Sequence, residues 1–411
     1  MKRTLAGMAV VAALTASATP IVSNVRVAQS ESRLVTVNYA LAGAPAVVTM
    51  NVQTNAGDGA WIDIGGEHVW SLHHDTWSPA GDVFRRVEAD GEHAFTWRPD
   101  RSWPDLKLAA GATRIVVTAW APEDAPDYMS IELRQNGDVG YYPSADYVPG
   151  GVLSNEAYRT TSLLLRRIHA RGVPWTMGNQ FESDRRADRE DVHTVTLTND
   201  YYLGVFEITQ RQWTSVGANL RHTIVDLHDM RPMTYVSYDD IRDRGNAANA
   251  WPAEPGQDSW LDRARKMVGL ALELPSEAEW EFACRAGMPE GYWGSGTRYG
   301  NGYEGRYDRN RGDETTAICG SYRPNRFGLY DMHGNVLEWC LDWGRLDISA
   351  LNGAVNVEQD AHSDVRGKRI IRGGGWSMAS SFMRSSFRAW NFPNYQVDSY
   401  GFRVACRAGL K

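Results

Sequence analysis

Short runs of strand-forming residues, separated by turn residues, most strongly constrain the fold of this chain. Clusters of Gly, Pro, Asp and Asn divide the region from Pro20 to about Arg134 into such runs, which include residues 33–39, 46–52, 93–97 and 113–120. Strands at this spacing, with no helical periodicity between them, are typical of a small sandwich of two sheets. We therefore predict an all-β immunoglobulin- or fibronectin-like sandwich over residues 20–140. It contains no catalytic constellation, and glycan binding by its aromatic residues is the alternative to a spacer role.

A segment rich in Gly, Pro and Tyr, residues 136–151, interrupts the strand pattern. These residues favour turns, so we place a linker at 141–155. Beyond it, strand-like runs alternate with two helix candidates, one after Ser237 and one near Ser276. This alternation predicts an α+β domain rich in loops over residues 156–411.

The N-terminus is typical of a secretory signal peptide. Lys2 and Arg3 precede an apolar stretch that ends near Leu14, and Ala16-Ser17-Ala18 follows. We predict a signal peptide over residues 1–18 and export to the periplasm, the cell surface or the extracellular space. A transit peptide is the alternative. No later run is long and apolar enough to predict a transmembrane segment.

Net charge and cysteine spacing limit the partners and the metal chemistry. The formal net charge of −7 disfavours nucleic acid as a partner. The four cysteines are an even number in a chain predicted to be exported, which makes disulfides plausible. No Cys-x-x-Cys pair occurs, so the spacing disfavours a structural zinc site.

Eight segments of the C-terminal region carry a family resemblance through their fixed order. They are Trp175–Gly178, His193–Leu197, Tyr201–Thr209, Arg231–Tyr238, Leu274–Gly287, Gly328–Trp339, Arg372–Trp376 and Gly401–Arg403. Together they resemble the formylglycine-generating enzyme, or sulfatase-modifying factor, family over about residues 160–408. The resemblance implies an irregular α+β fold related to C-type lectin domains.

One of these segments, 274–287, also has a local physical interpretation. Ser276 and Glu279 form a Ser-x-x-Glu capping box, and Gly287 can end the helix. We predict a framework helix in which Glu277 and Glu279 are solvated or capping rather than catalytic.

The resemblance implies a calcium site and a disulfide. The calcium ligands would be the Asp331 side chain, the Gly334 and Val336 carbonyls and the Glu338 carboxylate, which are oxygen donors as calcium prefers. A carboxylate-braced turn without metal is the alternative, and no ligands are assigned in a second loop between residues 301 and 313. The implied disulfide joins Cys284 to Cys406. Cys319 and Cys340 are then the two cysteines that remain, and nothing else supports a disulfide between them.

This chain lacks the metal-binding residues that the chemistry implied by the resemblance requires. Enzymes of the family oxidise a sulfatase cysteine to an aldehyde with oxygen and a copper(I) ion held by two cysteines. Those positions fall on Met378 and Met383, and Gly375 replaces the usual serine. Two neutral thioethers supply no thiolate, so we predict that copper is unlikely and assign no catalytic residue. Met378 and Met383 are then apolar filler or part of a binding face. The scattered histidines also disfavour an iron site.

We therefore predict a non-catalytic binding protein with an exported protein or a glycan as ligand. The alternatives are an oxidase that makes formylglycine through an atypical metal site, and a scaffolding role. The segment 376–400 is rich in Ser, Asn and aromatic residues, as binding surfaces of antibodies are, and is similar to variable regions diversified by retroelements. Its candidate contact residues are Trp376, Ser377, Met378, Phe382, Arg384, Phe387, Trp390 and Tyr395.

Overall fold

A computed structural model describes residues 19–407, with the exception of residues 56, 58, 71–78, 103–110, 180–189, 221–226, 243–253, 289–304, 308–314, 347, 349–350 and 356–366. The predicted signal peptide lies outside the described residues, as does most of the second calcium loop. Within the described residues, no helix is long and apolar enough to cross a membrane.

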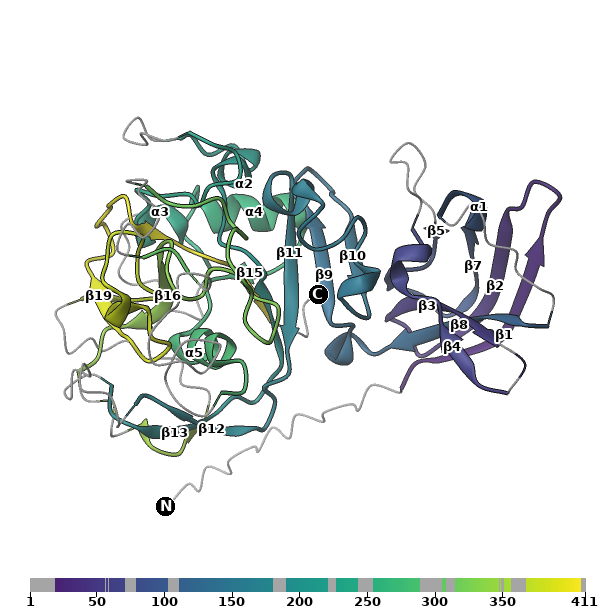
Figure 1. The fold of residues 1–411 in the computed structure, drawn as a ribbon, viewed down its shortest axis with the longest axis horizontal. Helices are drawn as coiled ribbons and strands as arrows, with labels where there is room; N and C mark the ends of the chain where they lie inside the picture. Colours follow the sequence, from purple (N-terminus) through teal and green to yellow (C-terminus); the bar gives the residue numbers. More distant parts are fainter. Residues whose placement is uncertain are drawn as a thin grey trace, which may run out of the picture.

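The N-terminal lobe consists of two antiparallel sheets (Figure 1). In β2, residues 35, 37, 39 and 41 are buried and their neighbours are more exposed, because alternate side chains of a strand point to opposite faces. The short helices of this lobe are α1 (Pro99–Ser102), η1 (Gly66–His68) and η2 (Pro122–Asp124). One sheet has the strand order β1 (Ile21–Gln29), β2 (Val35–Ala42), β7 (Gly91–Trp97), β5 (Ala80–Gly81). In the other sheet, β3 (Ala46–Asn55) pairs with β4 (Trp61–Asp63), β6 (Arg85–Val87) and β8 (Thr113–Trp120). The immunoglobulin-like assignment of this lobe stays a prediction.

A six-stranded sheet forms the centre of the rest of the molecule. Its order is β10 (Val139–Tyr142), β9 (Tyr128–Glu132), β11 (Ser162–Ile168), β14 (Tyr201–Gly204), β21 (Ala405–Arg407), β15 (Leu272–Glu273). Strands β9 and β10 precede or overlap the start of the predicted linker, yet β9 pairs with β11 through five residue pairs, from Ser162 opposite Glu132 to Arg166 opposite Tyr128. The sheet of the C-terminal region thus begins before residue 141. Figure 1 shows β9 and β10 between this region and the N-terminal strands.

Two smaller sheets and four α-helices complete the described part of the C-terminal region, which is sheet-rich and mixed α+β as predicted. The sheets have the orders β19 (Ala389–Asn391), β18 (Arg369–Arg372), β16 (Leu337–Trp343), β20 (Tyr400–Gly401), and β12 (Pro174–Met177), β13 (His193–Thr196), β17 (Ala354–Val355). The helices are α2 (Gln210–Ser215), α3 (Tyr238–Ile241), α4 (Trp260–Val268) and α5 (Glu277–Arg285), with 3₁₀ helices η3 (Ala145–Tyr147), η4 (Glu156–Arg159) and η6 (Ser380–Met383).

Helix α5 begins and ends where its sequence predicts. The Ser276 hydroxyl accepts a hydrogen bond from the Glu279 backbone N–H, and the Glu279 carboxylate accepts one from the Ser276 N–H. Ala286 and Gly287 follow the helix with positive φ, which costs little at Gly287 because glycine has no Cβ. The predicted capping box is therefore confirmed, and it fixes the start of a helix whose inner face carries several acidic side chains.

The hydrophobic core continues from one lobe into the other. One buried cluster joins Val48 of β3 to Tyr142 of β10, Leu164 of β11 and Phe206. A second cluster lies on the six-stranded sheet, where Trp213 and Trp260 stack with ring centroids 6.4 Å apart. The first cluster thus takes residues from both lobes, whereas a third cluster, which includes Ile168, Trp280 and Cys284, lies within the C-terminal region alone.

Candidate functional site

The two methionines at the predicted copper positions lie just beyond β18. Met383, at the end of η6, is 0% exposed, while Met378 is partly buried. A Cβ on Gly374, which has a φ of 76°, would lie 2.5 Å from the Met383 sulfur, so this position requires glycine. Met383 therefore packs against the backbone of the segment that follows Arg372. Two neutral thioethers, one of them sealed from solvent, do not fit a copper(I) site that exchanges with a substrate thiol.

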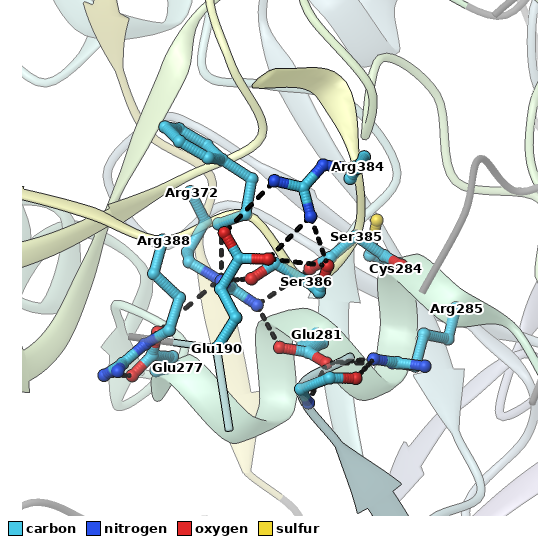
Figure 2. A network of polar contacts seen from close by, with 12 residues as sticks. Glu190, Glu277, Glu281, Cys284, Arg285, Arg372, Arg384, Ser385, Ser386 and Arg388 are labelled. Atoms are coloured by element: carbon cyan, nitrogen blue, oxygen red, sulfur yellow. Dashed lines mark hydrogen bonds and ion pairs between the residues drawn. The ribbon is translucent and has the colours of Figure 1, made fainter. Parts of the chain in front are cut away.

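Buried arginine–glutamate pairs involve residues before and after Met383 in the sequence, and Figure 2 shows their network. Arg372 donates to the Glu281 carboxylate and, at 2.8 Å, to the Ser385 carbonyl. The other oxygen of Glu281 accepts from Arg285 Nε at 2.9 Å and from the Gly178 N–H at 2.9 Å. These two arginines hold the pKa of Glu281 below its usual value against the opposing effect of burial. The Arg-Gly-Gly segment is thus tied by ion pairs to α5.

Two further pairs fix the segment from Arg384 to Arg388. Arg384 donates to both oxygens of Glu190, at 2.6 and 3.1 Å, and Ser386 Oγ donates to Glu190 at 3.2 Å. Arg388 binds both oxygens of Glu277, at 2.6 and 2.7 Å. Glu277 is 3% exposed, so its prediction as a solvated side chain is wrong. It instead belongs to a charge pair whose geometry is bidentate, the strong form of such contacts.

Asp342 on β16 lies next to this network, where the charges of Glu277 and Arg388 act on its carboxyl group. Its Oδ2 accepts the Glu277 N–H at 2.5 Å, and its buried Oδ1 accepts no hydrogen bond from the described residues. Burial, followed by the charge of Glu277, raises the pKa of Asp342 to about 8. This carboxyl group is therefore largely protonated at neutral pH.

All four cysteines are free and buried in the structure, which corrects the implied Cys284–Cys406 disulfide. Cys284 packs in the cluster between α5 and β16, with its sulfur 3.7 Å from His333 Nε2, whereas Cys406 on β21 packs in the cluster of the six-stranded sheet. The remaining pair is also not formed, since Cys319 and Cys340 are both free thiols and belong to different clusters. Burial raises the pKa of Cys406 to about 12, so this thiol is unreactive.

Three of the four implied calcium-binding residues, Asp331, Gly334 and Val336, lie in the turn before β16, whereas Glu338 lies on β16 and is already engaged. Its carboxylate accepts two hydrogen bonds from Arg403, both of 2.7 Å, and one from Trp280 Nε1 of 2.8 Å. Asp331 Oδ2 accepts the Gly320 N–H at 2.7 Å. The turn depends on backbone strain, since Asp331, Gly334 and Asn335 have φ of 60°, 132° and 68°.

Asp331 instead groups with Glu207 and Cys319, neither of which the sequence predicted as a metal ligand. One ligand atom each of Glu207, Cys319 and Asp331 lies within 4.8 Å of the others. Burial raises the pKa of Asp331 to about 6 and that of Glu207 well above its usual value, the latter with added repulsion from Asp331 and Glu338. The implied set of Asp331, Gly334, Val336 and Glu338 therefore fits the structure poorly as a calcium cage. An acidic residue within the apolar segment 201–209 was the available sequence signal for Glu207.

The predicted contact residues of segment 376–400 do not form one surface. Ser377 and Tyr395 are exposed, and Met378, Phe382 and Trp390 are partly buried. The remaining three are buried and therefore structural: Trp376, Arg384 and Phe387, exposed by 5%, 4% and 5%.

Comparison with known proteins identifies the family. Residues 166–408 match the sulfatase-modifying factor enzyme 1-like domain. The chain belongs to this family. A formylglycine-generating enzyme of Streptomyces coelicolor is 34% identical over 167 residues, which are 37% of this chain and 52% of that protein. The serine/threonine-protein kinase Pkn1 of Chlamydia trachomatis serovar L2 is 27% identical over 264 residues, which are 62% of this chain and 40% of the kinase.

A structural comparison finds PvdO from Pseudomonas aeruginosa, with 25% identity and a TM-score of 0.48 over 59% of this chain and 94% of that one. The chain spans about half or less of the length of the two curated relatives. The matched domain spans all eight ordered segments, and it occurs both in a formylglycine-generating enzyme and in a serine/threonine-protein kinase.

Proposed function

We propose that this protein is an exported, non-catalytic binding member of the sulfatase-modifying factor family, with a protein or a glycan as its ligand. The observation that carries the proposal is the state of the two family copper positions: both are methionine, and Met383 is sealed in the core. An oxidase of this kind needs two thiolates that the substrate thiol can reach. Neither requirement is met at these positions.

The ion pairs around Met383 support a structural role for the region. Arg372 and Arg384 each bind a buried glutamate, so the segment that would hold copper is fixed in place by charges buried with it. Loss of one partner would leave an unpaired buried charge, at a cost of about 3–5 kcal/mol. We infer that the family fold serves here as a rigid scaffold for surface contacts.

Two places on the molecule are available for a ligand. Ser377, Phe392 and Tyr395 are exposed on the segment that follows β18, and Tyr395 lies 5.8 Å from the ring of Tyr400. A cavity of about 360 Å³ lies between β6 of the N-terminal lobe and the six-stranded sheet, where Tyr141, Leu270 and Cys406 line it. A concave site of this size, which charged side chains such as Arg85 and Glu88 line together with apolar ones, suits a small ligand or a single side chain of a larger one.

The test uses the whole chain, loaded with copper(I) and given a cysteine peptide with the sulfatase motif. Mass spectrometry measures conversion of the cysteine to the aldehyde, and elemental analysis measures retained copper. We expect neither conversion nor stoichiometric copper. The matched variant Met378→Cys/Met383→Cys should retain copper(I), because it restores two thiolates. Aldehyde formation by the wild-type chain would overturn the proposal and favour the alternative, an oxidase with an atypical metal site.

A further inference from the structure

The buried cluster of Glu207, Cys319 and Asp331 has the composition of a metal site. Glu207 follows β14, Cys319 lies in a separate loop, and Asp331 lies in the turn before β16. One ligand atom from each lies within 4.8 Å of the others, and the residues are 0%, 0% and 2% exposed. Among the described residues, no other group of three or more His, Cys, Asp or Glu side chains lies close enough together to bind one ion.

A second observation is an oxygen of Asp331 that has no hydrogen-bond partner. Asp331 Oδ1 is buried and accepts no hydrogen bond from any described residue, while Oδ2 of the same carboxylate binds the Gly320 N–H. A buried carboxylate oxygen without a donor is costly unless a cation or a proton satisfies it. This observation is independent of the clustering of the three residues.

The charges around the cluster are unbalanced. The charge of Arg403 acts on three carboxyl groups, those of Glu207, Asp331 and Glu338. This arginine donates from Nε and one Nη to the two oxygens of Glu338. Arg159 also acts on Asp331, but it directs its hydrogen bonds to the carbonyls of Cys319 and Leu153. A divalent cation between Glu207 and Asp331 would offset the remaining negative charge.

Neighbouring groups hold the ligands in position. Asn335 Nδ2 donates to Glu207 Oε2 at 2.6 Å, and the Val336 N–H donates to Oε1 at 3.2 Å. Asn335 is fixed in turn by the Ala317 N–H, which donates to its Oδ1 at 2.8 Å. Cys319 Sγ lies 3.5 Å from Glu207 Oε2. Hydrogen bonds that orient carboxylate ligands from behind are a regular feature of metal sites.

We propose that Glu207, Cys319 and Asp331 bind a borderline-soft divalent metal ion, of which zinc is the best match, in a closed structural site. Calcium takes only oxygen ligands, whereas zinc accepts thiolate and carboxylate together. Three side chains leave one position of a tetrahedral zinc for a water or a backbone oxygen. The set shares only Asp331 with the calcium site implied by the family, and cysteine spacing along the sequence gave no sign of it.

Cobalt(II) is the probe, because a thiolate bound to cobalt(II) gives a charge-transfer absorption that carboxylates do not. The whole chain is denatured and refolded with cobalt(II) or zinc(II), since the closed site excludes metal from the folded chain. We expect one metal ion per chain, a charge-transfer band, and a higher melting temperature than for the chain refolded with chelator. Cys319→Ala should lose the band and bind zinc at least tenfold more weakly.

Cys340→Ala is the matched control, since Cys340 is an equally buried free thiol outside the cluster, and it should keep both the metal and the band. If Cys319→Ala does not fold, Glu207→Gln provides the second variant, and it should weaken zinc binding without removing the thiol. Refolded wild-type chain with no retained metal would overturn the proposal and indicate that protons satisfy the two carboxylates. Preferential calcium binding that survives Cys319→Ala would also overturn it, in favour of an oxygen-only site.

Discussion

At the residue scale, buried glutamates and arginines determine what this site can do. Arg372, Arg384, Arg388 and Arg403 each form a close pair with one buried glutamate. Burial removes the water that stabilises a charge, so each pair is stable only with its partner in place. These glutamates are therefore engaged in structure, whereas Asp331 and Asp342 each keep one buried carboxyl oxygen that accepts no hydrogen bond from the described residues.

Asp342→Asn should change how stability depends on pH. The pKa of Asp342 is about 8 in the folded chain, above the usual 3.8, so the folded chain holds this proton more tightly than the unfolded chain does. Its contribution to stability is complete below about pH 4 and is lost as the pH rises through about 8. Asparagine does not ionise, so at pH 9 the variant should be more stable than wild type by on the order of 1 kcal/mol or more.

Urea unfolding at pH 5 and pH 9 measures this difference, with exposed Asp138→Asn as the control. The decline between the two pH values should be smaller in Asp342→Asn than in wild type and unchanged in the control. Parallel pH profiles for wild type and Asp342→Asn would show that Asp342 ionises normally.

At the element scale, helix α5 organises the region around the methionines. Glu277, Glu281 and Arg285 recur every four residues and therefore lie on one face of the helix. This face meets β18 through Arg372, which lies 3.6 Å from Glu277 and pairs with Glu281. The position of the Arg-Gly-Gly segment thus depends on where α5 starts.

Ser276→Ala tests this dependence, because it removes the N-cap of α5. The Glu279 N–H would lose its acceptor. The free energy of unfolding of the variant should therefore be about 1 kcal/mol lower than that of wild type. Urea denaturation followed by circular dichroism provides the measurement. Exposed Ser377→Ala is the control and should stay within about 0.5 kcal/mol of wild type. Equal losses in the two variants would contradict a capping role.

At the scale of the whole molecule, the two lobes share strands and core. Strands β9 and β10 extend the sheet that contains β11, and residues of β3 and β10 occupy one buried cluster. The linker predicted at residues 141–155 would therefore separate β9 and β10 from the other strands of the six-stranded sheet. The predicted linker includes Tyr142 and Tyr147, both buried in that cluster.

A fragment of residues 150–411 should fold poorly for this reason. It lacks β9, so the backbone groups of one β11 edge lose their partners, and Leu164 and Phe206 lose the apolar side chains that cover them. A fragment of residues 121–411 keeps β9 and β10 and should give more soluble protein and a sharper thermal transition in near-ultraviolet circular dichroism. Equal cooperativity of the two fragments would argue against the shared sheet.

The sequence by itself determined the family, the mixed α+β character and the capping of α5. Ser276 and Glu279 are only three residues apart, so their capping box is visible in the sequence. The order of the eight family segments is likewise a property of the sequence alone. The replacement of both copper positions by Met378 and Met383 is likewise visible in the sequence alone.

Only the tertiary structure decided which distant side chains meet. Glu190 and Arg384 are 194 residues apart, and Glu207 lies 112 residues before Cys319, separations at which sequence patterns carry no contact information. The same limit explains the errors: Glu277 is buried by an arginine 111 residues away, and Cys284 and Cys406 pack in separate clusters. Local patterns fix helices and strands because their hydrogen bonds join near neighbours, whereas burial and charge pairing are set by how the sheets pack.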